Sequence, residues 1–365
     1  MYIYQRSGWP GLKWAKEEVA ARLAEVRHRQ GRLLGRMEGL GFAQSDEALL
    51  KTLTLDVLKS SEIEGEMLDA AQVRSSVARR LGLDIAGLVP SDRRVDGVVA
   101  MTLEAARNYS KPLTEARLLG WHKLLFPPRE GRASRIRTGA WRDDAGGPMQ
   151  VVSGPLGRER VHYQAPPAPQ VPGEMASFLE WANRTGDMDP VLKAAAAHLR
   201  LVTVHPFDDG NGRIARAVAD WALARSENSP RRFYSMSAQI RRERDGYYDM
   251  LEKTQKGTLD VTEWMLWFLG CLDRAIEGAG LSLAAVLKKD AFWKDHAGTP
   301  LNERQRLMLN KLLDGFEGKL TSTKWAKIAG CSQDTAQRDM ADLAEKGLLV
   351  KNSAGGRSTS YSLKE

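Results

Sequence analysis

The sequence predicts a mainly α-helical protein with one β-hairpin and a small separate domain at its C-terminal end. Apolar residues recur at helical spacing through most of the chain, which is typical of amphipathic helices. The composition changes to Gly, Pro and β-forming residues between 137 and 172, and it changes again after Pro300. We therefore predict an N-terminal helical module (1–95), a helical core with the hairpin (96–275), a helical connector (276–299) and a C-terminal domain (300–365).

The composition of the 365 residues is that of an ordinary globular protein, with 42% apolar and 27% charged residues. The first 13 residues contain no apolar signal segment, and the longest apolar run, 264–272, is too short to cross a bilayer. Cys271 and Cys331 stand in no metal-binding or redox spacing, so we expect a cytoplasmic protein. Because no segment is long and apolar enough to cross a bilayer, we expect no membrane partner. The net charge of +8 indicates either a polyanionic partner or mild basicity without a specific role.

The N-terminal module is expected to be helical. Apolar residues at helical spacing predict a first helix over 12–40, and Ser45 with Asp46 is expected to cap a second helix. The charged segment 84–96 is predicted to connect this module to the core. In the core, a helix over 120–126 is expected to end at the two prolines that follow it.

In the core, two short runs of β-forming residues, 149–152 and 160–163, flank a Gly- and Pro-containing turn at 154–157, which predicts a β-hairpin. After 300 we expect helices over 301–313, over 323–329 with a cap at Thr321 and Ser322, and over 334–346. Alternating residues over 348–363, around Gly355 and Gly356, then predict two paired strands.

The strongest chemical signal lies between two apolar helices. The first, over 192–204, must end before Pro206, because proline disfavours α geometry at His205. The loop Asp208-Asp-Gly-Asn-Gly212 then leads directly into a helix over 213–224. Free N–H groups at a helix N-terminus attract anions, and glycines let the backbone approach a phosphate closely.

The side chains around this loop suit phosphate chemistry. Arg213 and Arg216 can hold two phosphate groups, Asp209 offers an oxygen to Mg²⁺, and His205 can accept a proton near neutral pH. An EF-hand would need an oxygen ligand at Arg213 and glycine at Ile214, and a Walker P-loop would need Gly-Lys-Ser/Thr, so both are excluded. The other histidines are expected to be structural: His28, His122, His162, His198 and His296.

The segment His205-Pro-Phe-Asp-Asp-Gly-Asn-Gly-Arg-Ile-Ala-Arg216 resembles the signature of the Fic family, His-x-Phe-x-Asp/Glu-Gly-Asn-Gly-Arg-x-x-Arg, at every fixed position. The resemblance implies a Fic helical core and a protein adenylyltransferase that moves AMP from ATP to a hydroxyl side chain, with Mg²⁺. It also implies individual roles: His205 as general base, Phe207 as loop anchor, Asp209 as metal ligand, Gly210, Asn211 and Gly212 as anion hole, and Arg213 and Arg216 as phosphate ligands.

The similarity extends over about 137–269. It implies that Met149, Gln150, Val151 and Val152 belong to a flap that aligns the target segment by strand-like pairing. Tyr247, Tyr248 and Gln255 resemble the region that holds the adenine, although core packing explains the two tyrosines equally well. The open alternatives for the reaction are transfer of phosphocholine, UMP or phosphate, and removal of AMP.

Residues Ser60-Ser-Glu-Ile-Glu-Gly65 resemble the inhibitory motif of the family, Ser/Thr-x-x-x-Glu-Gly/Asn, in the subclass inhibited by its own N-terminal helix. Ser60 and Glu64 lie one helical turn apart, and a Glu64 carboxylate beside Arg216 would take the place of the γ-phosphate. The alternative is that Glu62, Glu64 and Glu66 form a solvated acidic face.

The C-terminal domain resembles a winged helix-turn-helix. The expected DNA contacts are Gln333, Thr335, Gln337 and Arg338 on the second helix of the motif, with Lys351 and Arg357 on the wing. Docking of a protein is the alternative, because Asp334, Asp339 and Asp342 oppose a phosphate-facing helix. The expected partners are therefore ATP, a protein substrate, which can be the chain itself, and DNA or a protein at this domain. A homodimer is left open.

Overall fold

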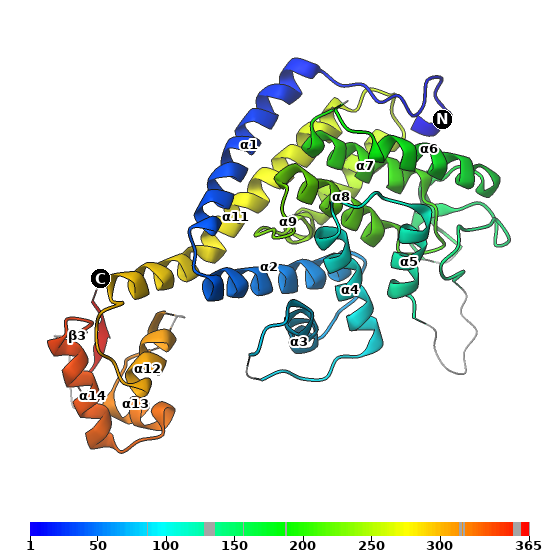
Figure 1. Cartoon of the computed structure of the whole chain (residues 1–365). Coiled ribbons are helices and arrows are strands. Elements are labelled where there is room, and N and C mark those ends of the chain that lie inside the picture. Colours follow the sequence, from blue (N-terminus) through cyan, green and yellow to red (C-terminus); the bar gives the residue numbers. More distant parts are fainter. Residues whose placement is uncertain are drawn as a thin grey trace. The chain divides into compact units, whose positions relative to one another are not determined.

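The computed structural model confirms a mainly α-helical protein (Figure 1). It describes residues 1–85, 87–127, 136–155, 157–186, 188–313, 316, 318–352 and 359–364. The chain forms two compact units, one of residues 1–39 and 46–280 and the other of residues 40–45 and 281–365. The finer domain boundaries at 95, 275 and 299 stay predictions.

The helices that build the first unit follow one another along the chain, and the last of them continues into the second unit. They are η1 (Ile3–Gln5), α1 (Lys16–Glu38), α2 (Phe42–Ile63), α3 (Ala70–Leu81), α4 (Arg93–Arg107), α5 (Glu115–Leu125), η2 (Ala168–Gln170), α6 (Val171–Asn183), α7 (Pro190–Val204), α8 (Asn211–Glu227), α9 (Met236–Arg242), α10 (Arg244–Gln255) and α11 (Thr262–Asp295). Within the described residues no helix is long and apolar enough to span a bilayer.

The N-terminal segment is joined to a distant part of the first unit by backbone hydrogen bonds. Lys13 N donates to Leu259 O at 2.8 Å, and Val261 N donates back to Lys13 O at 2.8 Å. Beyond this bridge, α1 runs along the first part of α11, where Arg22 forms an ion pair of 2.8 Å with Asp273 (Figure 1). The start of the chain is thus part of the same packed unit as residues 257–273.

Helices α7 and α8 pack against each other at the centre of the first unit. All residues of α7 from Val191 to Val204 are buried, and the run of four alanines at 194–197 lets neighbouring helices approach closely. Because both helices are enclosed by other elements, the loop between them is held at both ends.

The predicted hairpin is confirmed. Strand β1 (Gln150–Ser153) pairs antiparallel with β2 (Arg160–Gln164), and the register shifts between Val151 and Val152. The Tyr163 hydroxyl donates to Thr203 O at 2.6 Å, which fixes β2 against the end of α7. In the predicted turn, Leu156 lies outside the described residues.

The second unit contains three short helices followed by two paired strands. These are α12 (Glu303–Leu313), α13 (Ser322–Ala329), α14 (Gln333–Glu345), β3 (Leu349–Lys351) and β4 (Tyr361–Leu363). The core is built around Met308, Trp325 and Leu343. Gly355, Gly356 and Arg357 lie outside the described residues, and the winged helix-turn-helix assignment stays a prediction.

Several predicted boundaries are wrong. Helix α1 begins at Lys16 and not at residue 12, because Lys13 is held in the backbone bridge to residues 259 and 261. Helix α2 begins at Phe42, and Ser45 N already donates to Gly41 O at 2.9 Å, so Ser45 and Asp46 are inside the helix and do not cap it. The connection after α3 ends at Asp92 and not at Asp96, because the Asp92 carboxylate caps α4 by accepting from Val95 N at 2.8 Å.

Candidate functional site

His205 lies directly after α7, as its position before Pro206 predicts. Its backbone is left-handed, with φ 51° and ψ 58°, a strained conformation for a residue with a side chain. Two contacts hold it: His205 N donates to Leu201 O at 2.9 Å, and His205 O accepts from Arg142 Nε at 2.7 Å. The surrounding structure therefore fixes the direction of the imidazole.

The His205 ring is arranged as a proton acceptor. Its Nδ1 is 3.2 Å from Val202 O, and only a protonated Nδ1 can donate to a carbonyl, so Nε2 keeps its lone pair. Burial lowers the pKa of His205, which keeps the ring neutral near pH 7. The Gln255 amide donates to the same Val202 O at 3.2 Å and so helps to orient the carbonyl that sets the tautomer.

The loop after His205 is closed by its own side chains. Asn211 bonds both backbone groups of Phe207, accepting from its N at 3.0 Å and donating to its O at 2.8 Å. The buried Phe207 ring stacks on His122, with 4.3 Å between ring centroids. His122 accepts from Gly139 N at 2.9 Å, so its other nitrogen donates to Asp209 O at 3.2 Å. His122 is thus structural, as predicted, and the Asn211 side chain serves the loop.

The two glycines of the loop leave room for a ligand. Gly210 has φ 80°, and a Cβ there would be 2.9 Å from the Phe126 ring. A Cβ on Gly212 would be only 2.2 Å from Glu64 Oε1. The N-cap residue of α8 is Gly210, which has no side chain to bond the first-turn N–H groups, and the Glu64 carboxylate lies against Gly212 in that turn.

Arg216 is buried and bound by the end of α2. Its Nε donates to Ser60 Oγ at 3.0 Å, and its Nη2 donates to Ser60 O at 2.9 Å and to Glu64 Oε1 at 2.8 Å. Gly65 follows at φ 80°. Glu64 therefore contacts the second arginine of the loop motif and is not a purely solvated surface charge.

Arg213 is also paired with a carboxylate from the segment after α2. Its Nη1 donates to Glu66 Oε2 at 2.7 Å, and Glu66 Oε1 is 2.5 Å from Arg94. The Arg213 guanidinium lies 5.2 Å from the centre of the Phe126 ring, and its Nε is buried with no hydrogen-bond partner among the described residues. Nothing in the sequence predicted the pairing of Glu66 beyond its position two residues after Glu64.

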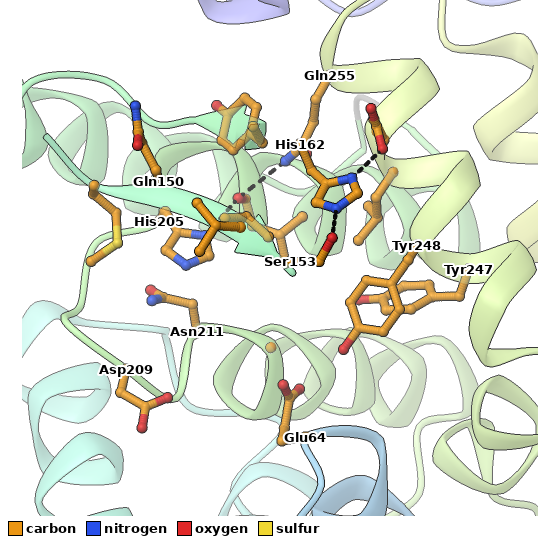
Figure 2. Close-up of a pocket in the computed structure, with 18 of the residues that line it drawn as sticks. Glu64, Gln150, Ser153, His162, His205, Asp209, Asn211, Tyr247, Tyr248 and Gln255 are labelled. Atoms are coloured by element: carbon orange, nitrogen blue, oxygen red, sulfur yellow. Dashed lines mark hydrogen bonds and ion pairs between the residues drawn. The ribbon is translucent and has the colours of Figure 1, made fainter. Parts of the chain in front are cut away.

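A cavity of about 590 Å³ lies over this loop, between the hairpin and α10 (Figure 2). Tyr247 lines it and is also a core residue, since it is 2% exposed and bonds His198 Nε2 at 2.8 Å. Most predicted site residues form its wall: Glu64, Met149, Gln150, Val151, Val152, His205, Asp209, Gly210, Asn211, Gly212, Tyr247, Tyr248 and Gln255. Ser60, Gly65, Arg213 and Arg216 are not part of the wall.

Three of the wall residues that were not predicted form a chain of hydrogen bonds (Figure 2). Ser153 Oγ is 2.5 Å from His162 Nε2, and His162 Nδ1 is 2.5 Å from Glu252 Oε2. Arg160 also pairs with Glu252, at 3.0 Å. His162 was expected to be structural; it does tie the hairpin to α10, but it also lines the cavity.

The site suits a metal ion that arrives with a phosphate ligand. Among the described residues no group of three or more His, Cys, Asp or Glu side chains is placed to hold a metal. The Asp209 side chain is 57% exposed, and its Oδ1 accepts from Gly210 N at 2.6 Å. Mg²⁺ is commonly held by one or two carboxylates with phosphate oxygens and water, so a single aspartate fits this ion.

Residues 112–223, which contain the loop and both of its helices, match the model of the Fic/DOC family. This segment of the chain is thus similar to the Fic/DOC family. Residues 2–83 match a second model, described as a domain of unknown function (DUF4172). The crystal structure of a Fic family protein from Desulfovibrio desulfuricans has the same fold, with a TM-score of 0.56 over 94% of this chain and 95% of that chain, at 23% identity.

Curated relatives carry the name protein adenylyltransferase Fic. The one from Drosophila ananassae is 25% identical over 222 residues, which are 59% of this chain and 39% of the relative. Protein adenylyltransferase fic-1 from Caenorhabditis briggsae is 46% identical over 68 residues, 18% of this chain and 13% of the relative. The matches thus span about two fifths or less of the length of these relatives.

Proposed function

We propose that this Fic protein transfers AMP from ATP to a hydroxyl side chain of a protein. The observation that carries the proposal is a neutral His205 with an accepting Nε2, placed beside the uncapped N-terminus of α8 and its two buried arginines. Phosphoryl-type transfer needs little more than positioned phosphates, a proton acceptor and positive charge. The names of the curated relatives support the same reaction.

In this reaction the triphosphate binds at the first turn of α8, with Arg213 and Arg216 on its phosphates. The target hydroxyl oxygen forms a bond to the α-phosphorus and gives its proton to His205 Nε2. The bond from the α-phosphorus to the bridging oxygen breaks, and pyrophosphate leaves. Mg²⁺ bound at Asp209 would neutralise phosphate charge.

The cavity walls suggest how the two substrates are held. Residues 150–153 of β1 offer a strand edge to an extended target segment. Tyr247 and Tyr248 would hold the adenine, with Gln255 as a weaker contact, because one of its amide hydrogens is already bound to Val202. Removal of AMP, a cytoplasmic location and a homodimer remain predictions.

We further infer that Glu64 inhibits the enzyme. Its carboxylate is bound to Arg216 and lies against Gly212, where a γ-phosphate would approach α8. ATP would have to displace this carboxylate to reach a productive position, and Ser60 would hold the end of α2 in place meanwhile.

The role of His205 is tested by His205→Ala. We expect loss of AMP transfer with nearly unchanged ATP affinity, because the variant lacks the proton acceptor and keeps the phosphate ligands. Transfer is measured with labelled ATP and affinity by calorimetry. Substantial transfer by the variant would refute the assignment, whereas loss of ATP binding as well would point to a role in binding.

The second unit supports DNA binding as an additional function. Gln333, Gln337 and Arg338 are exposed on α14. Two acidic residues that would repel phosphate are engaged elsewhere: Asp339 is buried and pairs with Arg304 at 2.8 Å, and Asp342 is bound by Gln305 and Lys346.

DNA binding by this unit is expected to weaken steeply with salt, and Arg338→Ala together with Lys351→Ala should reduce both the affinity and its salt dependence. A gel-shift titration with duplex DNA at several salt concentrations measures this. If no salt-sensitive shift is seen, protein docking becomes the favoured role.

A further inference from the structure

The first unit contains a second cavity, of about 370 Å³, that shares no wall residue with the first. It is lined by residues 10–12 and Trp14 of the N-terminal segment, Ser177 and Trp181 of α6, and Arg200 of α7. Arg200 is on the same helix that ends before His205, and the chemistry proposed above makes no use of it.

Arg200 is an unusual residue for a protein interior. Its side chain is buried, with 3% of the residue exposed, its Nε has no hydrogen-bond partner among the described residues, and the Glu174 carboxylate acts on it electrostatically without a hydrogen bond. Buried guanidinium groups are normally paired, because an unpaired buried charge is costly. Burial lowers the pKa of Arg200 only to about 10, so the group is still charged at neutral pH.

Aromatic rings offset part of this cost. The guanidinium carbon of Arg200 lies 4.5 Å from the centre of the Trp181 ring and 5.6 Å from that of Phe178. Stacking leaves the N–H groups at the edge of the guanidinium free, and these groups bind two oxygens of one anion side by side. The missing partner of Arg200 is therefore an anion that enters the cavity.

We propose that this cavity binds a small monocarboxylate with a flat apolar body. The carboxylate would accept two hydrogen bonds from Arg200, while Trp14, Trp181 and Pro10 provide apolar wall. Glu180 and Arg184 also line the cavity and pair with each other, so Arg200 supplies its one unbalanced charge and a monoanion matches it better than a dianion such as phosphate. The volume lies near the lower end for ligand pockets, which fits a small molecule better than a peptide.

The test uses the full chain and two probes, phenylacetate and indole-3-acetate, with calorimetry and thermal unfolding as readouts. Both acids should bind and raise the unfolding temperature. Phenylacetamide lacks the charge, and inorganic phosphate lacks the apolar body. Both should bind at least roughly ten-fold more weakly than the two acids. Equal binding of acid and amide, or no binding of either acid, would refute the proposal.

Arg200→Met should reduce the affinity for the acids roughly ten- to a hundred-fold. The unfolding temperature of the ligand-free variant should be equal to that of the wild type or higher. Arg225→Met is the matched control, because Arg225 stacks on Trp221 at 4.8 Å but does not line the cavity. This variant should bind both acids as the wild type does. Ser177→Trp keeps Arg200 and fills the cavity, so it should also abolish binding even if Arg200→Met does not fold. Undiminished binding in Ser177→Trp would contradict the location.

Discussion

Arg216 is the residue on which three groups at the end of α2 and just after it converge: the hydroxyl and carbonyl of Ser60 and the carboxylate of Glu64. Glu64 can reach it only because position 212 has no Cβ. The same open space is what a phosphate would need to approach the N–H groups of α8. In the reaction proposed above, a carboxylate and a γ-phosphate would therefore compete for the same guanidinium at this one position.

We predict that Glu64→Gly increases AMP transfer by roughly ten- to a hundred-fold, since a charge-assisted hydrogen bond contributes about 1.5–3 kcal/mol. The rate of automodification with labelled ATP measures the change. Glu62→Gly is the matched control, because Glu62 is also near the end of α2 but pairs with Lys59 and Arg241. The gain should vanish when His205→Ala is added, and a Glu64→Gly variant as slow as the wild type would leave Glu64 without an inhibitory role.

At the scale of elements, the hairpin is held at the cavity by few contacts. Tyr163 fixes β2 to α7, while Glu252 of α10 binds His162 and Arg160 of the same strand. Val152 and Val161 are exposed, so little apolar burial contributes at the outer end. The Glu252 contacts are thus the main link between the outer hairpin and α10.

We predict that Glu252→Gln loosens the hairpin. Partly exposed ion pairs contribute about 0.2–1 kcal/mol each, so amide hydrogen exchange at 150–164 should speed up by roughly two- to five-fold. Mass spectrometry of exchange in that segment checks this. Lys253→Gln, which removes the neighbouring pair with Glu263, should leave the hairpin unchanged; equal effects of both substitutions would mean a general loosening of α10.

The helix end and the loop of the site could be predicted from neighbouring residues in the sequence. The side-chain pairs that depend on tertiary packing could not. Pro206 ends α7, glycines shape the loop, and both features are encoded within a few residues. Arg213 and Glu66 are 147 residues apart in sequence, and His162 and Glu252 are 90 apart, so only the packing of helices brings each pair together. The start of α2 was misjudged because Ser and Asp favour caps without excluding helix interiors.

The first unit as a whole contains buried histidines that must stay neutral. Burial is the main cause that lowers the pKa of His198 to about 3, and nearby Arg216 adds to it. His198 would bind a proton in the unfolded chain near pH 6.5 but not in the folded one. Its contribution to stability is therefore complete above about pH 6.5 and is lost progressively as the pH falls below that value.

We predict that the free energy of unfolding falls by about 1.4 kcal/mol per pH unit below about pH 6 through His198 alone. Denaturant unfolding between about pH 7 and 5 measures the slope. His198→Asn should reduce the slope by about one proton. Parallel slopes for wild type and His198→Asn would show that His198 does not control acid sensitivity.

The backbone bridge between Lys13 and residues 259–261 has a consequence for how this protein can be divided. By sequence, residues 2–83 match one family model and residues 112–223 match another. In space, however, the first residues of the segment 2–83 are bonded beside the start of α11, and its last helices carry Ser60 and Glu64 to Arg216. Without this segment, residues 112–223 would lose the contacts that it makes, so separation of the two parts would disrupt folding and, under the proposed function, the inhibition by Glu64 as well.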